Sequence, residues 1–369
     1  MRYYRPTFAE INLNNLAYNF RRIKALVAPN TKILVTVKAD AYGHGLIPVS
    51  KKLISCGVDY LGVASIDEGI LLRDAGIKVP ILILGMILKC DIAPLFIYNL
   101  TPTVCDLELA RALEKKAASL KKIKAIQIKV DTGMGRIGVM HYDARGLVKD
   151  ISKFKHLTIG GLFTHFAFAD INRKFTLYQI GLFNKLVQRL ESSGLHIPLL
   201  HTANSIGLID LKSSHFNMVR PGLVIYGLYP RENLKIKLRP VLSLKTRIVF
   251  VKDLPKGHGV SYGHEYTTTR NTRIAILPIG YGDGYPRNLS NKAPVLIKGR
   301  KFTISGRICM DQSMVDVGKF KVKPGDEAVL IGSQGRKSIT VEELANLSGT
   351  IPYEIVCGLG SRIPRIFHE

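Results

Sequence analysis

The 369-residue chain is 46% hydrophobic and 22% charged, as expected of a globular protein with one large domain or two ordinary ones. Its longest apolar run, 79–88, is far shorter than the roughly 20 residues of a membrane-spanning helix, and its start lacks a signal-peptide stretch, so we expect a cytoplasmic protein with no membrane association. The net charge of +25 is extreme, but the basic residues are spread along the chain, which favours a solvated basic surface over a nucleic-acid site.

The first two-thirds of the chain alternates between short apolar runs and segments of helical periodicity. In chain order the pattern predicts strand 9–15, helix 15–27, strand 32–38, helix 46–56, strand 60–65, helix 66–74, strand 79–85, strand 101–105, helix 106–120, strand 124–130, helix 142–154, strand 157–165, helix 175–194, strand 198–203, a short helix 205–209 and strand 216–220. The strands are rich in Val, Ile and Leu, as parallel strands buried on both faces should be. A strand–helix count near eight favours a (β/α)8 TIM-type barrel over an open doubly wound sheet.

The pattern changes after residue 230, where strand-like segments are separated by Gly and Pro turns. These segments are 242–254, 272–285, 293–308, 313–318 and 326–332, with one helix near 340–349. We therefore predict an α/β protein with an N-terminal barrel domain, 1–237, and a mostly-β C-terminal domain, 238–369. The first strand precedes the barrel series, and we expect it to be able to pair with the C-terminal domain.

The cysteines do not form a recognisable framework. They are odd in number, scattered and without C-x-x-C spacing, which argues against disulfides and against a structural zinc site. We expect most of them to be small apolar residues, buried or half-buried, and we expect no metal centre. The five cysteines are Cys56, Cys90, Cys105, Cys309 and Cys357.

Unusual polar residues stand at the carboxyl ends of five predicted barrel strands. In a (β/α)8 barrel that rim carries the active site, built from several strands. A single such residue is usually a satisfied polar group, but five strand ends together favour a site. A lysine that ends a buried strand is especially costly unless it is paired or chemically used. The residues are Lys38; Lys129 and Asp131, with Arg136 in the next loop; His165; His201, Asn204 and Ser205; and Arg220.

The last barrel loops add a second pattern, one that suits an anion. Ser205, Gly222 and Leu223 can bring a hydroxyl and backbone amides together after the last two strands, where barrels often bind phosphate. A phosphate site close to a lysine suggests pyridoxal 5'-phosphate, whose aldehyde forms a Schiff base with a lysine amine.

Eight segments extend this interpretation. They are VKADAYGHG, VDTGMGRIG, HTANS, VRPGLVIYGLYP, VSYGHEYT, LPIGYGDGYPR, GRICMDQ and YEIVCGLGSRIPR. Together, and in this order, they resemble the motifs of alanine racemases over essentially the whole chain. The resemblance implies a pyridoxal-phosphate enzyme that interconverts L- and D-alanine and supplies D-alanine for peptidoglycan. It also implies a homodimer in which the β domain of one subunit completes the active site of the other.

The resemblance assigns the two proton carriers. Lys38 would hold the cofactor and act as a base on one face of the substrate, and Tyr262 of the partner subunit would act on the opposite face. The ordinary pKa values of lysine and tyrosine, about 10.4 and about 10, must both be lowered for this task. Burial and neighbouring cations can lower the lysine pKa, and the resemblance implies that Arg136 helps Tyr262 and binds substrate.

The resemblance also assigns the remaining site residues. Arg220 would face the pyridine nitrogen and, because arginine only donates, would leave it unprotonated and favour proton exchange over transamination. His165 would link Tyr262 to Arg220, and Lys129 is carbamylated in some family members. Asn204 would also contact the cofactor. The phosphate would be bound by Tyr42, Ser205, Gly222, Leu223 and Tyr353, and the substrate would meet the partner's Met310 amide and Asp311, with Tyr281 at the site entrance.

Two positions depart from the family pattern: Asp40 stands where an asparagine is usual, and Pro352 stands where an asparagine is common. A carboxylate at position 40 is expected to raise the pKa of Lys38. Three other functions stay open. A serine or broad-spectrum racemase has the same fold, an amino-acid decarboxylase would need a C-terminal cysteine motif not seen here, and a non-catalytic pyridoxal-phosphate-binding protein would lack the β domain.

Overall fold

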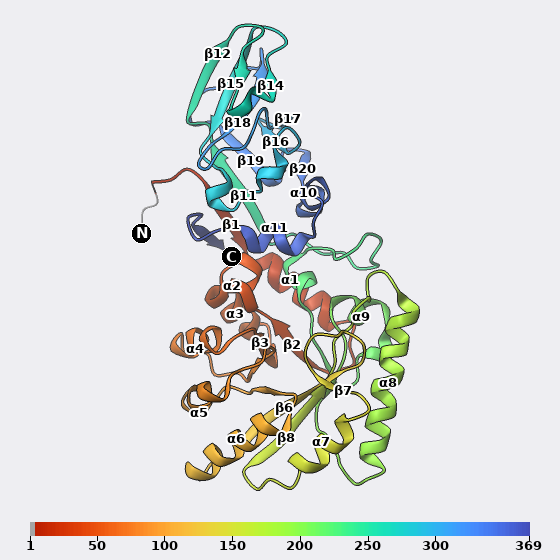
Figure 1. Ribbon diagram of the computed structural model, residues 1–369. Coiled ribbons are helices and arrows are strands. Elements are labelled where there is room, and N and C mark those ends of the chain that lie inside the picture. The colour runs from red at the N-terminus through yellow and green to blue at the C-terminus, as the bar shows by residue number, and fades with distance from the viewer. Residues whose placement is uncertain (1–3) are drawn as a thin grey trace.

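The computed structural model describes residues 4–369 and contains a barrel of eight parallel strands below a β domain (Figure 1). The pairing order is β10-β2-β3-β4 in one arc and β5-β6-β8-β9 in the other. A parallel bridge between Leu82 and Thr101 joins the arcs, and at the second seam the Arg220 amide donates to the Ala203 carbonyl at 2.9 Å. The predicted (β/α)8 barrel is confirmed. Its strands are β2 (Lys32–Thr36), β3 (Tyr60–Val63), β4 (Ile81–Ile83), β5 (Thr103–Val104), β6 (Lys124–Asp131), β8 (Leu157–Phe163), β9 (Leu200–His201) and β10 (Met218–Val219).

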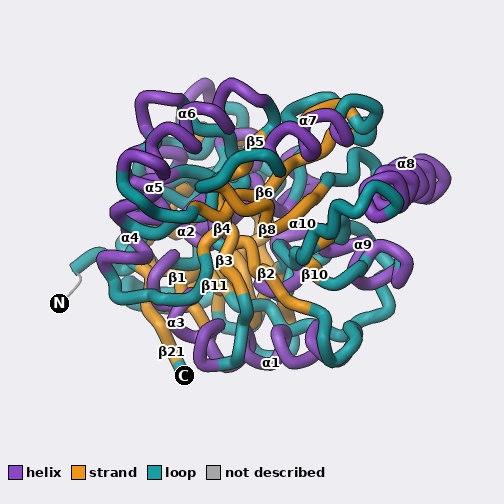
Figure 2. Tube along the Cα trace, turned by 90° about the horizontal axis from the view of Figure 1, so that it is seen from below, coloured by secondary structure: helices purple, strands orange, loops and turns teal. Residues whose placement is uncertain are grey.

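Helices surround these strands, as the view from below in Figure 2 shows. Their starts follow from the sequence, because Ser65, Asp106 and Asn172 each accept a hydrogen bond from a backbone amide of the first turn. Among the helices of residues 4–369, none has both the length and the apolar character to cross a bilayer. The barrel helices are α1 (Leu13–Lys24), α3 (Leu46–Ser55), α4 (Ile66–Asp74), α5 (Ala93–Ile97), α6 (Leu107–Ser119), α7 (Ala144–Ile151), α8 (Arg173–Glu191) and α9 (Ser205–Asp210).

The β domain is built on a seven-stranded sheet of order β17-β16-β19-β11-β1-β21, with β20 on the edge of β19. A three-stranded sheet, β12-β15-β18, and the β13–β14 hairpin complete it. Its strands are β1 (Phe8–Asn12), β11 (Leu242–Arg247), β12 (Phe250–Leu254), β13 (Gly259–Val260), β14 (Tyr266–Thr267), β15 (Thr272–Leu277), β16 (Pro294–Ile297), β17 (Arg300–Thr303), β18 (Ser313–Gly318), β19 (Glu327–Gln334), β20 (Lys337–Ile339) and β21 (Arg365–His368).

The strand that precedes the barrel, β1, lies in the sheet of the β domain. It pairs antiparallel with β11 and parallel with β21, and the chain passes directly from β1 into α1. Two helices cover this domain, α10 (Val341–Ser348) and α11 (Pro352–Gly358). The sequence pattern predicted only the first of them. Pro352 stands at the start of α11, where a missing N–H costs no helical hydrogen bond, so this departure from the family pattern is compatible with the helix.

A buried asparagine on α1 joins the barrel to the segment that leads into the β domain. The amide nitrogen of Asn19 donates to the carbonyls of Ile225 at 3.0 Å and Arg239 at 2.8 Å. Its oxygen accepts from the Arg239 amide at 2.8 Å. Because Asn19 is fully buried, water cannot replace these three bonds.

We predict that Asn19→Ala lowers the free energy of unfolding by about 3 kcal/mol, since it leaves backbone groups of Ile225 and Arg239 without partners. Asn15→Ala on the same helix is the matched control, because Asn15 donates one solvent-accessible bond to the Pro240 carbonyl at 2.7 Å. That control should lose about 1 kcal/mol or less. Urea titration of both variants measures the difference, and equal losses would contradict the assignment.

Candidate active site

Lys38 follows β2 and opens a tight turn, Lys38–Gly43, labelled α2. Ala39, Asp40, Ala41 and Tyr42 all have φ between 52° and 53°, so four successive non-glycine residues form a left-handed helical turn. Such a conformation costs an L-residue roughly 1–2 kcal/mol. The turn therefore needs support from the surrounding structure, and strain of this kind is usually found at functional sites.

Two carboxylates hold the turn in place. Glu68, on α4, accepts from the Ala39 amide and from the Ala64 amide, both at 2.6 Å. Asp40 accepts from the Leu46 amide at 2.7 Å and so fixes the start of α3. An asparagine oxygen at position 40 can make the same bond, which explains how the chain tolerates this departure from the family pattern.

A buried histidine supports the far end of the turn. Nδ1 of His44 donates to the carbonyl of Tyr42 at 2.7 Å and approaches that of Ala41 at 3.1 Å. Burial lowers the pKa of His44 to about 4, so the ring is neutral near pH 7. The ring stands beside that of Tyr226, with centroids 4.5 Å apart. The Tyr226 ring also contacts the ring of Tyr42, with centroids 5.2 Å apart, so His44 holds the Tyr42 backbone and supports the ring on which its side chain packs.

The amine of Lys38 lies where its charged form is disfavoured. Its pKa is lowered by burial and then by the Arg136 guanidinium, whereas Glu68 and Cys357 raise it. The carboxylate that opposes the shift is Glu68, and the Asp40 carboxylate is instead directed to Leu46. We expected the carboxylate at position 40 to raise the pKa of Lys38, but the carboxylate that does so is Glu68.

Four further polar residues of the strand ends gather around Lys38. Burial, followed by Arg136 and Arg220, lowers the pKa of Lys129 to about 8. The pKa of His165 is held well below its ordinary value by burial and by the cations Arg220, Lys129, Arg136 and Lys38. Because each of these side chains affects the pKa of another, Lys38, Lys129, His165 and Arg220 form one group at the carboxyl ends of β2, β6, β8 and β10, with Arg136 nearby.

Arg220 is the most firmly held member of this group. Its Nη1 donates to Nδ1 and to the carbonyl of His201, at 2.9 and 2.8 Å, and its Nη2 donates to the carbonyls of Thr164 and Thr202, at 2.6 and 3.1 Å. Because Nδ1 of His201 accepts, its Nε2 must donate to the Gln127 oxygen at 2.8 Å. Burial lowers the pKa of Arg220 to about 9, so the guanidinium stays charged at neutral pH.

The predicted phosphate-binding residues also lie together. Oγ of Ser205 accepts from the Gly222 amide at 3.0 Å, and a Cβ at Gly222 would stand 2.9 Å from the Tyr42 hydroxyl. The Tyr42 ring meets that of Tyr353 edge to face at 5.6 Å, and Leu223 begins the short helix after Gly222. Only glycine leaves space at this point, between the hydroxyl of Tyr42 and the last barrel strand.

Other residues have local roles that the motifs did not reveal. Asn204 caps α9, since its oxygen accepts from the Gly207 amide at 3.0 Å. Glu68 follows Ser65 in an S-x-x-E pattern, which signals a helix start and gave no sign that the carboxylate reaches Lys38. Cys357, on α11, was expected to be a structural cysteine, yet it lies within electrostatic reach of Lys38.

Tyr353 is the one predicted site residue of the β domain that joins this group within the described chain, and the other four do not. Tyr262 is 70% exposed in a short turn between β13 and β14, and Figure 1 shows β14 in the part of the domain farthest from the barrel. Tyr281 and Met310 are also exposed, and so is Asp311. The structure therefore brings together the barrel residues and Tyr353, and Arg136 lies exposed at their edge.

Comparison with known proteins identifies the family. Residues 11–230 match the description "Alanine racemase, N-terminal domain" and residues 241–367 match "Alanine racemase, C-terminal domain". The alanine racemase of Halothermothrix orenii is 48% identical over 365 residues, which cover 98% of this chain and 96% of that protein. That of Carboxydothermus hydrogenoformans is 45% identical over 368 residues, covering 98% and 100%. The chain belongs to the alanine racemase family.

Solved alanine racemases share the whole fold. The structure from Clostridium difficile 630 has a TM-score of 0.94 and 39% identity, covering 100% of this chain and 97% of that one. A Bacillus anthracis alanine racemase structure with bound L-Ala-P has a TM-score of 0.94 and 35% identity, covering 100% and 96%. The predicted family, the barrel-plus-β fold and the alanine racemase activity are confirmed by these relatives.

Two substitutions should move the pKa of Lys38 in opposite directions. Glu68→Gln removes a negative charge and should lower that pKa further, whereas Arg136→Gln removes a positive charge and should raise it. The measurement is the pH dependence of Lys38 acetylation in cofactor-free protein, read by peptide mass spectrometry, with Lys51 as an exposed reference. Shifts of the same sign in both variants would contradict the electrostatic assignment.

Proposed function

We propose that this alanine racemase binds pyridoxal 5'-phosphate at Lys38 and uses two proton carriers, Lys38 and the Tyr262 of a second copy of the chain. The observation that supports the proposal is that one turn connects the reactive lysine to the predicted phosphate site. This strained turn begins with Lys38 and contains Tyr42, whose hydroxyl faces Gly222 and Ser205. The turn thus connects an amine of lowered pKa to the residues that we propose bind the phosphate.

The residues present fit the cofactor. The absence of a side chain at Gly222 leaves space next to the Tyr42 hydroxyl, which can donate a hydrogen bond to a phosphate oxygen. Arg220 has only hydrogen-bond donors, which suit the lone pair of a pyridine nitrogen. In the proposal Lys38 binds the aldehyde carbon, Arg220 faces the ring nitrogen, and the phosphate is bound by Tyr42, Ser205, Gly222, Leu223 and Tyr353, with Asn204 beside them. When bound, this cofactor withdraws electron density from the substrate α-carbon and makes its proton removable.

The lowered pKa of Lys38 prepares its amine for proton transfer. Burial and Arg136 increase the fraction of neutral amine at a given pH, and neutral Nζ can accept a proton from one face of the substrate. The charge of Glu68 limits this shift, so the protonated amine can still return a proton. Both directions of racemisation need the same group to accept and to donate.

The opposite face needs a donor from outside this chain. Tyr262 is 70% exposed on the β domain, and its hydroxyl is available to a neighbouring subunit. We propose that it enters the partner's site together with Met310, Asp311 and Tyr281, the Met310 amide binding the substrate carboxylate. In that site the neutral His165 would link Tyr262 to Arg220 without adding a further positive charge.

Arg220 would limit side reactions. Four hydrogen bonds fix its guanidinium, which has no hydrogen-bond acceptor and would therefore leave a pyridine nitrogen bound against it unprotonated. Electron withdrawal is then weaker than with a carboxylate partner, which favours return of the proton over transamination. Lys129, with a pKa of about 8, has a larger neutral fraction at neutral pH than an ordinary lysine, and we propose that this fraction can be carbamylated near Arg136. Electron density beyond its Nζ tests this point.

The substrate range can be proposed from the relatives and from how weakly a pocket distinguishes similar side chains. The relatives act as alanine racemases, but a pocket distinguishes a hydroxyl or methylene only by roughly 10- to 200-fold, so we propose alanine as the main substrate with weak serine racemisation. Relative kcat/KM for the two amino acids tests this ranking. The cytoplasmic location stays a prediction.

The decisive assay combines the purified chain with pyridoxal phosphate and L-alanine. We expect a visible absorbance band, formation of D-alanine, and, after borohydride reduction and peptide mapping, a pyridoxyl label on Lys38. Lys38→Arg is the control and should lose both label and activity while keeping its positive charge. A label on another lysine, or none, would refute the proposal.

Shared sites can be tested by mixing two inactive variants. Lys38→Ala and Tyr262→Phe subunits, carrying different affinity tags, are co-expressed and the mixed dimers are isolated. One site then has both intact residues and the other has neither, so the mixed dimer should show about half of the wild-type kcat. Each parent variant alone should remain inactive, and an inactive mixed dimer would argue that Tyr262 does not act across the interface.

A further inference from the structure

A fully buried carboxylate, that of Asp283, lies in the turn that carries Tyr281. Both oxygens of Asp283 accept from Arg5, with Nη1 and Nη2 each at 2.5 Å. Nε of Arg362 lies 3.4 Å from Asp283, and the Gly280 amide donates to it at 3.0 Å. One carboxylate thus joins the start of the chain, its last segment and the turn 280–284. A bidentate arginine pair of this kind is among the stronger ion pairs in proteins.

This turn and the loop that carries Met310 form one unit. The amides of Tyr281 and Gly282 donate to the carbonyls of Cys309 and Met310, at 3.0 and 2.9 Å. A Cβ at Gly280 would stand 2.1 Å from the Cys309 carbonyl, so the two segments are in tight contact.

Arg362 ties the outer side of the loop to the same carboxylate. Its Nη2 donates to Asp311 at 2.7 Å, while its Nε faces Asp283. A continuous ion-pair chain therefore runs from Arg5 through Asp283 and Arg362 to Asp311. The three residues proposed to enter the partner's substrate site, Tyr281, Met310 and Asp311, all lie on elements that this chain holds.

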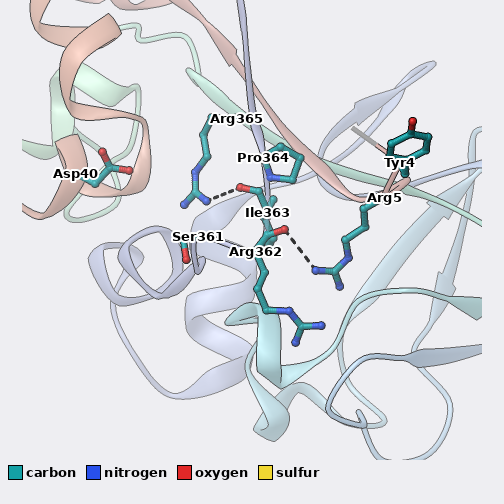
Figure 3. Close-up of a pocket in the computed structure, with 8 residues that line it drawn as sticks. All are labelled: Tyr4, Arg5, Asp40, Ser361, Arg362, Ile363, Pro364 and Arg365. Atoms are coloured by element: carbon teal, nitrogen blue, oxygen red, sulfur yellow. Dashed lines mark hydrogen bonds between the residues drawn. The ribbon is translucent and has the colours of Figure 1, made fainter. Parts of the chain in front are cut away.

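The segment 359–365 connects this unit to the Lys38 turn of the same chain. The Asp283 carbonyl accepts from the Gly360 amide at 2.9 Å, and Nε of Arg365 donates to the Gly43 carbonyl at 3.1 Å. Figure 3 shows the segment with Arg365 and Asp40 toward one side and Arg5 and Arg362 toward the other.

The cavity drawn in Figure 3, of about 600 Å³, is rich in arginine but is not built for a free anion. Arg5 is directed to Asp283, and Arg362 is paired with Asp283 and Asp311. Arg365 donates to four backbone carbonyls, those of Gly43, Leu359, Gly360 and Ile363. These guanidinium groups therefore organise protein segments.

We propose that Asp283, with Arg5 and Arg362, is a positioning residue that sets the Tyr281 turn and the 309–311 loop for the partner's active site. This inference rests on the proposed sharing of sites between two copies of the chain. Loss of Arg5 leaves a buried carboxylate with an incomplete set of partners, and such a group relaxes toward other donors or solvent. The loops move with it, so substrate binding weakens in the partner's site while cofactor binding in the barrel does not.

The first test compares three variants of the holoenzyme: Arg5→Ala, Arg5→Lys and the control Arg273→Ala, which breaks an exposed pair with Asp253. Arg5→Ala should raise KM for alanine about tenfold, as loss of a charged hydrogen bond implies, with a smaller change in kcat. Arg5→Lys keeps one charge without the bidentate bond and should be intermediate, and the control should match wild type. The cofactor absorbance band should change little in all three. The melting temperature should fall in Arg5→Ala, because that variant leaves the buried Asp283 carboxylate without its bidentate partner, so KM is measured well below the melting temperature of each variant.

The second test places Arg5→Ala in only one subunit of the mixed dimer described above. Added to the Lys38→Ala subunit, which supplies the loops of the intact site, it should raise KM about tenfold. Added to the Tyr262→Phe subunit, whose loops serve the dead site, it should leave KM near that of the unmodified mixed dimer. Equal effects in the two subunits, or an unchanged KM in both, would overturn the inference. An inactive wild type or mixed dimer would instead count against the proposed function.

Discussion

The structure depends on keeping one amine neutral enough to react inside a group of positive charges. Lys38 stands at the end of a buried parallel strand, with Arg136, Lys129 and Arg220 nearby. Burial and like charge both disfavour its ammonium form, and Glu68 provides the opposing charge. The four-residue left-handed turn keeps the amine in this position, and its conformational cost is met by hydrogen bonds from Glu68, Asp40 and His44. Without these supports a turn of non-glycine residues would relax, and the amine would reach solvent.

The surrounding histidines reduce the electrostatic cost of the same arrangement. His165, His201 and His44 all have pKa values below the ordinary range because they are buried, and the first two also face Arg220. They remain neutral and act as hydrogen-bonding groups among cations. His201 shows the arrangement most clearly, since it accepts from Arg220 on one nitrogen and donates to Gln127 on the other.

Much of the fold could be predicted because apolar periodicity reports burial directly. Most of the alternating strands and helices of residues 32–220 and the polar strand ends were visible from residue order alone, but helix α5 (Ala93–Ile97) was not predicted. The turn at Lys38 was not, because Ala39 and Ala41 carry no signal for a positive φ. Helix α11 was hidden by its short length. Glu68 and Asp283 could not be assigned either, because their partners are set by tertiary contact: Arg5 and Asp283 are 278 positions apart. The exposure of Tyr262 likewise has no local signature.

The position of β1 has a consequence for how the chain is made. This strand is made before every other strand of its sheet, yet its two neighbours are β11, which begins at residue 242, and β21, which spans Arg365–His368. The barrel strands, all encoded between them, can pair during translation, since domains generally fold as units as they emerge. The first strand must wait, unpaired on both edges, until β11 has been made, and its second edge stays open until β21 follows. The central sheet is therefore completed only after all the barrel strands have been made, so the β domain is the last part of the fold to assemble.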